Sequence, residues 1–280
     1  IAAATDAEKA QYYFIKGNAH SDLATKKVEL PKNLALAAKA YQEVVTIEKT
    51  SGKAKYTAQA QSAIADIKNQ LINGAVDAAS DIDNRVLKCL TETKKILEDY
   101  KLSLNSNTEK EVEVLLEKKR KDLADCEKIK YDGYKAASLL LYQCYEIDRS
   151  DVEKLYYAGN YALNGEDYET AVKYYQECMK QNYSGEGMGY YAKNVVNDQE
   201  EFFGSTAASK ADRDSKVKLK LYSNPRDEKI PSKKGEILKN IALILVQQGK
   251  MDLAKTALAE AKAANPDDTT IAMTEANLYL

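Results

Sequence analysis

The chain has 280 residues, of which 44% are hydrophobic and 30% charged, so it can bury a core and does not have the composition of a disordered chain. Lys and Arg (41) nearly balance Asp and Glu (43), which excludes the basic footprint of a nucleic-acid-binding protein. No run of 18 apolar residues occurs, so no membrane insertion is expected. Only 12 glycines and 4 prolines interrupt a sequence rich in helix formers, which favours an all-α fold.

Small residues mark the first helices of the chain. Gly17 lies in YYFIKGNAH and Ala37 in LALAAKAYQEVV, and a turn around Pro31 separates the two segments. A further helix is expected over about 54–79, with Gly74 on one of its faces. Where two helix backbones approach within about 8–10 Å, only a small side chain fits between them. These positions therefore predict packed helix pairs.

Residues 84–130 are expected to form a protruding antiparallel helical arm. Apolar residues recur at steps of three and four on both sides of the turn SLNSN, and Thr108 begins a capping box that opens the second helix. An arm of about 20 residues would extend roughly 30 Å at 1.5 Å per residue. Its mixed charges are typical of a solvated helix surface.

Beyond the arm, the sequence repeats with a period of 34 residues. The pairs that are 34 residues apart are Tyr134 and Tyr168, Ala137 and Ala171, Cys144 and Cys178, and Ala242 and Ala276. Gly159 lies between the first two copies. A fixed period of this length is the mark of a stack of repeated units, each of which buries its neighbour's apolar face.

A second insertion is expected over 197–234. Part of it, about 205–221, is interpreted as the second helix of its repeat, and SNPRDEKIPSKK as a loop. The glycines of SGEGMGYY lack the strand and Lys-Ser/Thr of a phosphate-binding loop, so this segment is interpreted as a turn before a helix.

The spacing of these small residues resembles the tetratricopeptide repeat (TPR) family, in particular its exported bacterial members. In two copies the family's characteristic tryptophan is replaced by Leu155 and Leu238, while the small positions are kept by Gly159, Ala171 and Ala254. The resemblance implies a single TPR-type α-solenoid of antiparallel helix pairs over 1–280, with the arm inserted.

The sequence offers no pattern for catalysis. It contains one histidine, His20, and no Ser-His-Asp, Cys-His or metal-ligand arrangement can be built around that residue. We therefore expect no enzyme activity, no cofactor and no metal site.

The resemblance places one helix of each pair along a concave groove. An asparagine recurs at one groove position and a tyrosine at another, which gives the candidate peptide-binding residues Asn18, Tyr156, Asn160, Tyr190, Asn194 and Asn277. An asparagine amide can both donate to and accept from a peptide backbone. The same asparagine can instead bond a neighbouring helix, and both roles stay open.

The resemblance thus implies a non-catalytic scaffold that binds a protein or peptide in the groove. The alternative is a structural spacer or assembly subunit of a bacterial envelope complex that self-associates through the arm. The residues leave both the partner and the oligomeric state open.

The expected localisation is periplasmic or otherwise exported, with the cytoplasm as the alternative. The sequence begins with Ile1 rather than Met, which fits either an exported protein that has lost a signal peptide or a fragment of a longer chain. Cys89 and Cys126 fall close together in the predicted arm, where they form either a disulfide or, as we expect, a reduced pair. Cys144 and Cys178 are expected to be inert buried thiols.

Overall fold

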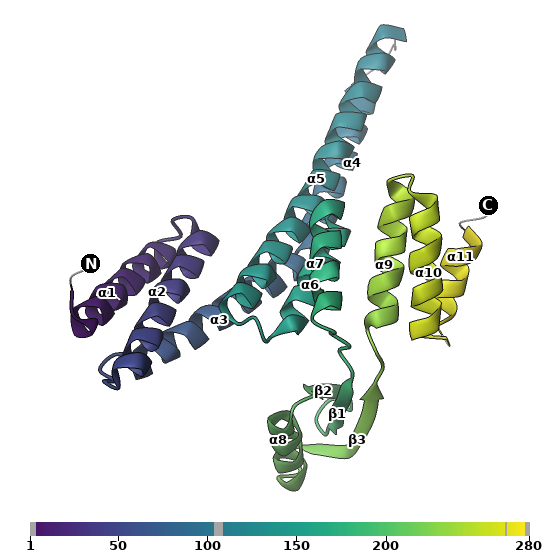
Figure 1. The fold of residues 1–280 in the computed structure, drawn as a ribbon. Coiled ribbons are helices and arrows are strands. Elements are labelled where there is room, and N and C mark those ends of the chain that lie inside the picture. The colour runs from purple at the N-terminus through teal and green to yellow at the C-terminus, as the bar shows by residue number, and fades with distance from the viewer. Residues whose placement is uncertain (1–3, 104–108, 267, 278–280) are drawn as a thin grey trace. The chain divides into compact units, whose positions relative to one another are not determined.

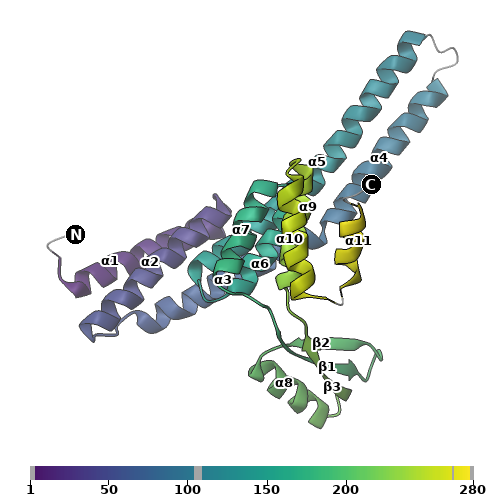
Figure 2. The same ribbon diagram turned by 45° about the vertical axis from the view of Figure 1, so that its right-hand side comes forward.

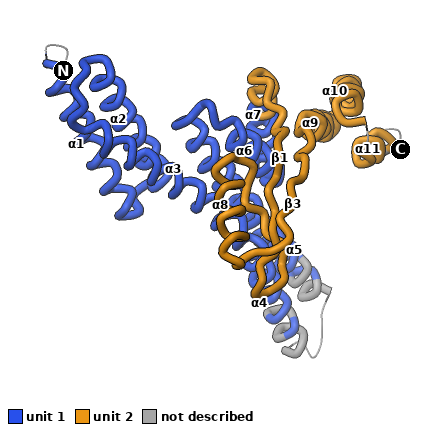
Figure 3. The backbone as a smooth tube through the Cα atoms, turned by 90° about the horizontal axis from the view of Figure 1, so that it is seen from below, with its two compact units in different colours: residues 1–174 blue, residues 175–280 orange. Residues whose placement is uncertain are grey.

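The computed structural model describes residues 4–103, 109–266 and 268–277. The chain is mostly helical, as predicted, but a three-stranded sheet lies within it (Figure 1). The mostly helical class is therefore confirmed, and the sheet is a small addition that the sequence did not predict. The chain divides into two compact units, residues 1–174 and 175–280 (Figure 3). The single solenoid over 1–280, with an insertion at 197–234, stays a prediction.

Unit 1 is built from helices that pack against their neighbours in the chain. They are α1 (Asp6–Thr25), α2 (Leu30–Ser51), α3 (Thr57–Ser80), α4 (Ile82–Ser103), α5 (Glu109–Ile147), α6 (Val152–Asn164) and the first part of α7 (Tyr168–Lys180). Helix α2 contacts α1 and α3, α3 contacts α5, and α5 contacts α6. Sequential contacts of this kind are what a stack of helix pairs needs. The TPR arrangement itself stays a prediction.

Helices α1 and α2 meet where Gly17 lies against the ring of Tyr41. A Cβ atom added to Gly17 would lie 2.5 Å from Cε1 of Tyr41. The ring has little room to withdraw, because Tyr41 is 3% exposed and its hydroxyl is hydrogen-bonded to Asn18. Glycine is therefore needed at this point because an aromatic ring packs directly on the backbone of α1.

Most small residues of the repeat pattern are completely buried, whereas Ala276, 34 residues after Ala242, is exposed. Those with 0% exposure are Ala137, Cys144, Ala171, Cys178, Ala242, Ala254 and Ala261. Beside Ala137 in α5, the Ser138 hydroxyl donates a hydrogen bond of 2.8 Å to the carbonyl oxygen of Ala158 in α6. A serine side chain has only one carbon between backbone and hydroxyl, so this bond shows how closely α5 and α6 approach.

Three helices that open expected pairs end in the same backbone motif. In α1, α6 and α9 (Lys234–Gln247), the second residue after the helix has a positive φ: 59° at Lys27, 55° at Glu166 and 70° at Gly249. In each case the next N–H donates to the carbonyl oxygen five residues earlier, as from Asp167 to Ala162. This left-handed stop satisfies a free carbonyl group and turns the chain toward the following helix.

Helices α4 and α5 contact each other and form an arm that extends away from the other helices of unit 1 (Figure 2). A disulfide joins Cys89 and Cys126 across the two helices, with their Cα atoms 5.7 Å apart. The expectation of a reduced pair is therefore wrong. The disulfide forms because the register of α4 and α5 places Cys89 and Cys126 opposite each other. The predicted capping box at Thr108 lies outside the described residues.

In unit 2, a sheet and one helix lie between α7 and α9 in the chain, and we call residues 187–230 the sheet module. Its elements are β1 (Gly187–Asn194), β2 (Glu200–Gly204), α8 (Ala207–Lys218) and β3 (Tyr222–Ile230). The strands are antiparallel in the order β2-β1-β3, and α8 contacts all three.

The sheet module corrects the interpretation of 197–234, and also that of SGEGMGYY as a turn before a helix. A helix does form within 205–221, as α8, but it packs on a sheet rather than on a partner helix. Adjacent aromatic residues explain the difference, since neighbours in a strand face opposite sides and aromatic residues favour strands. Tyr190 lies under Arg213 of α8, whereas Tyr191 packs against Phe202, with ring centroids 5.0 Å apart.

The helices of unit 2 share one apolar cluster. Helix α9 packs against α10 (Met251–Ala264), and α11 (Thr269–Asn277) contacts both. The buried members of the cluster are Leu238, Ala242, Ala257, Leu258, Ala261 and Ile271. Met179, from the end of α7, packs against this cluster and so joins that end of the helix to unit 2.

Two glycine substitutions test whether close helix contacts hold unit 1 together. Gly17→Ala forces a methyl group into the Tyr41 ring, and we expect a loss of about 1–3 kcal/mol in the free energy of unfolding. Gly74→Ala is the control, because its Cβ would lie 3.4 Å from a Leu140 methyl, and alanine favours the helix by about 0.5–1 kcal/mol. Urea denaturation measures both variants. Equal effects at the two sites would contradict the account.

Candidate interaction surfaces

Asn18 on α1 presents an oriented amide to solvent. The buried hydroxyl of Tyr41 donates a 2.8 Å hydrogen bond to Asn18 Oδ1. Asn18 is exposed, and its amide nitrogen donates to no residue within the described ranges. The bond to a neighbouring helix, considered from the sequence, is therefore present. This bond uses the Oδ1 atom of Asn18, and the Nδ2 amide group of Asn18 donates to no described residue.

Tyr156 and Asn160 lie together on α6, but they differ in accessibility. Tyr156 is buried, with 2% of its surface exposed, and Asn160 is half-buried. The adjacent Leu155 and Ala158 are both 0% exposed, so α6 is enclosed on several sides. This corrects the prediction that Tyr156 offers a stacking surface to a partner.

Tyr190 and Asn194 are corrected as groove residues, because they lie on β1 rather than on a helix. Asn194 donates to Glu201 Oε1 at 2.9 Å and accepts from the Val196 N–H at 3.0 Å, which closes the turn between β1 and β2. The Tyr190 ring lies 5.2 Å from the Arg213 guanidinium. Both side chains thus stabilise the sheet module. The side chain of Asn277 lies outside the described residues.

Arg213 is the buried charge of the sheet module, and nothing in the sequence singled it out. It is 4% exposed, forms ion pairs with Asp214 and Asp227, and donates 3.0 Å to the carbonyl oxygen of Arg226. Burial alone would lower the pKa of the guanidinium, but the hydrogen bonds that it donates to Asp227 and Asp214 outweigh burial and raise that pKa. The side chain therefore fastens α8 to β3 as a permanent cation.

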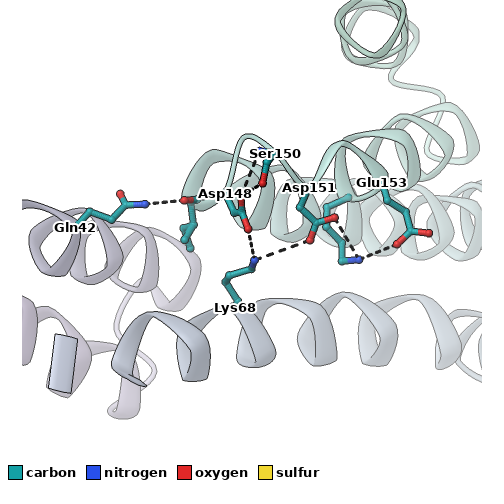
Figure 4. Close-up of polar contacts among 8 residues, drawn as sticks. Gln42, Lys68, Asp148, Ser150, Asp151 and Glu153 are labelled. Carbon is teal, nitrogen blue, oxygen red and sulfur yellow. Dashed lines mark hydrogen bonds and ion pairs between the residues drawn. The ribbon is translucent and has the colours of Figure 1, made fainter. Parts of the chain in front are cut away.

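Lys68 of α3 links two other segments of unit 1 (Figure 4). Its ammonium donates 2.8 Å to Asp148 and lies 3.9 Å from Asp151, both in the turn between α5 and α6. In α2, the side chain of Gln42 donates 2.6 Å to the carbonyl oxygen of Ile147, at the end of α5. These contacts join α2 and α3 to the same turn.

The Lys68 contact changes the ionisation of both partners. The pKa of Asp148 falls to about 2, because Lys68 donates to the carboxylate and Ser150 does the same. Burial would lower the pKa of Lys68, but the Asp148 carboxylate outweighs this and raises it. Both groups are therefore charged at neutral pH, as a structural link requires.

A cavity of about 480 Å³ lies where the start of α1 meets the end of α2 and the start of α3. Its most buried charge is Glu48, which is 4% exposed. The carboxylate accepts hydrogen bonds from the Tyr56 and Thr57 N–H groups and from the Thr57 hydroxyl. Burial would raise the pKa of Glu48, yet these donors lower it. Glu48 thus caps α3 and is not free to bind a ligand.

The described residues include no group of three or more His, Cys, Asp or Glu side chains able to hold a metal ion. Cys144 and Cys178 are buried thiols, and burial raises the pKa of both, to about 12 for Cys178. A thiol with a raised pKa is a poor nucleophile.

No described helix combines the length and the apolar character needed to cross a bilayer.

Comparison with known proteins adds no relative. No protein-family model matches the chain, and no curated protein matches it either. The resemblance to the TPR family therefore depends on the spacing of residues such as Ala137 and Ala171.

Asp148→Asn tests the link to Lys68 through its pH dependence. A carboxyl group with a pKa near 2, below the ordinary 3.8, stabilises the fold above about pH 4, and this contribution is lost as the pH falls through 2. Because the Asp148 side chain is 39% exposed, solvent screening reduces the expected loss at pH 7 to about 1 kcal/mol. The difference from wild type should shrink toward pH 2 in urea denaturation. Asp66→Asn, which removes an exposed carboxylate of α3, is the control. If the loss of unfolding free energy in Asp148→Asn did not change with pH, this interpretation would be contradicted.

Proposed function

We propose that the chain is a non-catalytic TPR-type scaffold that binds an extended peptide or protein segment along α1 of unit 1. The observation that carries this proposal is the amide of Asn18, held by Tyr41 with its donor facing solvent. An oriented donor loses little conformational freedom when it bonds a peptide carbonyl.

The surface around Asn18 supports a contact with apolar side chains as well. Ile15 is 58% exposed and precedes Asn18 by three residues, and Tyr12 is 44% exposed and lies three residues earlier again. Residues three apart are neighbours on a helix surface. A peptide whose backbone accepts from Asn18 would therefore place apolar side chains on Ile15 and Tyr12. These two residues take the role that the sequence assigned to Tyr156 and Tyr190.

Asn18→Asp tests this role, because the carboxylate still accepts from Tyr41 but cannot donate to a peptide. The full chain is used to select binders from a phage-displayed library of random peptides, and the selected peptides are titrated against each variant. We expect Asn18→Asp to weaken their binding at least about tenfold, the effect of losing one hydrogen bond at a desolvated contact.

Asn69→Asp is the matched control for this experiment. It makes the same chemical change at an exposed position of α3, so it should leave both peptide binding and stability unchanged. Failure to select any peptide, or equal binding to both variants, would contradict the proposal.

We further propose an exported location, supported by the disulfide between Cys89 and Cys126. Disulfides persist in oxidising compartments and are rare in the reducing cytoplasm. Protein isolated from its natural host without reductant, with thiols blocked at lysis, should show two free thiols on denaturation, those of Cys144 and Cys178. Four free thiols in that preparation would place the chain in a reducing compartment.

A further inference from the structure

Four exposed aliphatic side chains gather at one end of the sheet module. They are Val195 (52% exposed), Val196 (91%), Leu219 (67%) and Leu221 (53%), and we call them the aliphatic tip. Single exposed aliphatic residues are ordinary on protein surfaces, but a cluster from two adjoining turns marks a contact surface.

Hydrogen bonds hold the two turns of the aliphatic tip together. The Val195 N–H donates 3.2 Å to the carbonyl oxygen of Leu221, and Asn194 pairs with Tyr222 in the ladder between β1 and β3. At the end of α8, the Leu221 N–H also donates 3.1 Å to the carbonyl oxygen of Lys216. The side chains are therefore presented by a fixed backbone.

Lysines outnumber carboxylates in the two turns that carry the aliphatic tip, and Glu201 beside them is hydrogen-bonded to Asn194 and Tyr222. Residues 193–198 and 216–221 contain four lysines and one aspartate. Lys193 pairs with Asp198, and Lys216 pairs with Asp212. Lys218 and Lys220 are exposed and form no ion pair with any described residue. Two unpaired cations thus flank the aliphatic side chains.

We infer that the aliphatic tip docks on the surface of an anionic lipid bilayer. Its side chains would enter the boundary between headgroups and acyl chains, while Lys218 and Lys220 pair with lipid phosphates. This binding goes beyond the peptide-scaffold role and does not depend on it, because the aliphatic tip belongs to unit 2 and Asn18 to unit 1.

The chemistry of the aliphatic tip favours lipid over a protein partner. Protein interfaces depend on aromatic and arginine anchors seated in shaped pockets, whereas the four side chains here are all Val or Leu. A bilayer boundary accepts such side chains without a complementary shape, and its negative potential attracts each lysine near the surface.

Vesicle co-sedimentation of the full chain tests the inference. Phosphatidylcholine vesicles are compared with vesicles that also contain phosphatidylglycerol, at low and at high salt. We expect binding to the anionic vesicles that falls with salt, and weak binding to phosphatidylcholine alone. Val196→Ser with Leu219→Ser, and separately Lys218→Glu with Lys220→Glu, should each lower the affinity about tenfold or more.

Leu253→Ser with Met273→Ser is the matched control in unit 2, since these side chains are 58% and 67% exposed. This control should bind vesicles like wild type, and circular dichroism should show that all variants keep their fold. The inference is overturned if wild type does not bind anionic vesicles, or if the control loses as much affinity as the tip variants. It is also overturned if the tip variants bind vesicles normally and instead lose binding to an acidic peptide, which would make the aliphatic tip a protein contact.

Discussion

Close approach of helix backbones at glycine and alanine is the constraint on which the rest of this structure depends. At Gly17, the ring of Tyr41 occupies the space that a Cβ atom would fill. At Ala137 and Ala171, no surface is left exposed at all. Close packing of this kind leaves no room for larger side chains, so the sequence is restricted most strongly at its smallest residues. Tyrosines and leucines then fill the space around each contact.

Buried and half-buried charges add a second kind of link between elements. Glu48 caps α3 from α2, Lys68 joins α3 to the turn after α5, and Arg213 fastens α8 to β3. A buried charge that loses its partner is costly, so each link depends on both of its members.

Most small residues that the spacing singled out are buried, as at Ala137 and Ala171, because close helix packing requires small side chains at regular steps, but Ala276 is exposed. The same rule failed at Tyr190 and Asn194, where a 34-residue step lands on a strand. A count of residues cannot detect that the aromatic pairs at 190–191 and 202–203 alternate between two faces of a sheet. Tyr156 fits its expected place on α6, but its burial depends on packing from several sides, which the local sequence does not reveal. The Cys89–Cys126 bond likewise depends on the register of two helices, which the sequence predicted only to about one turn.

The most direct test of the central constraint compares two adjacent alanines in α5. Ala137 is fully buried and Ala136 is exposed, so helix propensity and sequence context are nearly the same for both. Leucine is introduced at each site in turn, and the free energy of unfolding is measured by urea denaturation. The account requires Ala137→Leu to cost about 2 kcal/mol or more and Ala136→Leu to change stability by less than about 0.5 kcal/mol. Equal tolerance of leucine at both positions would contradict it.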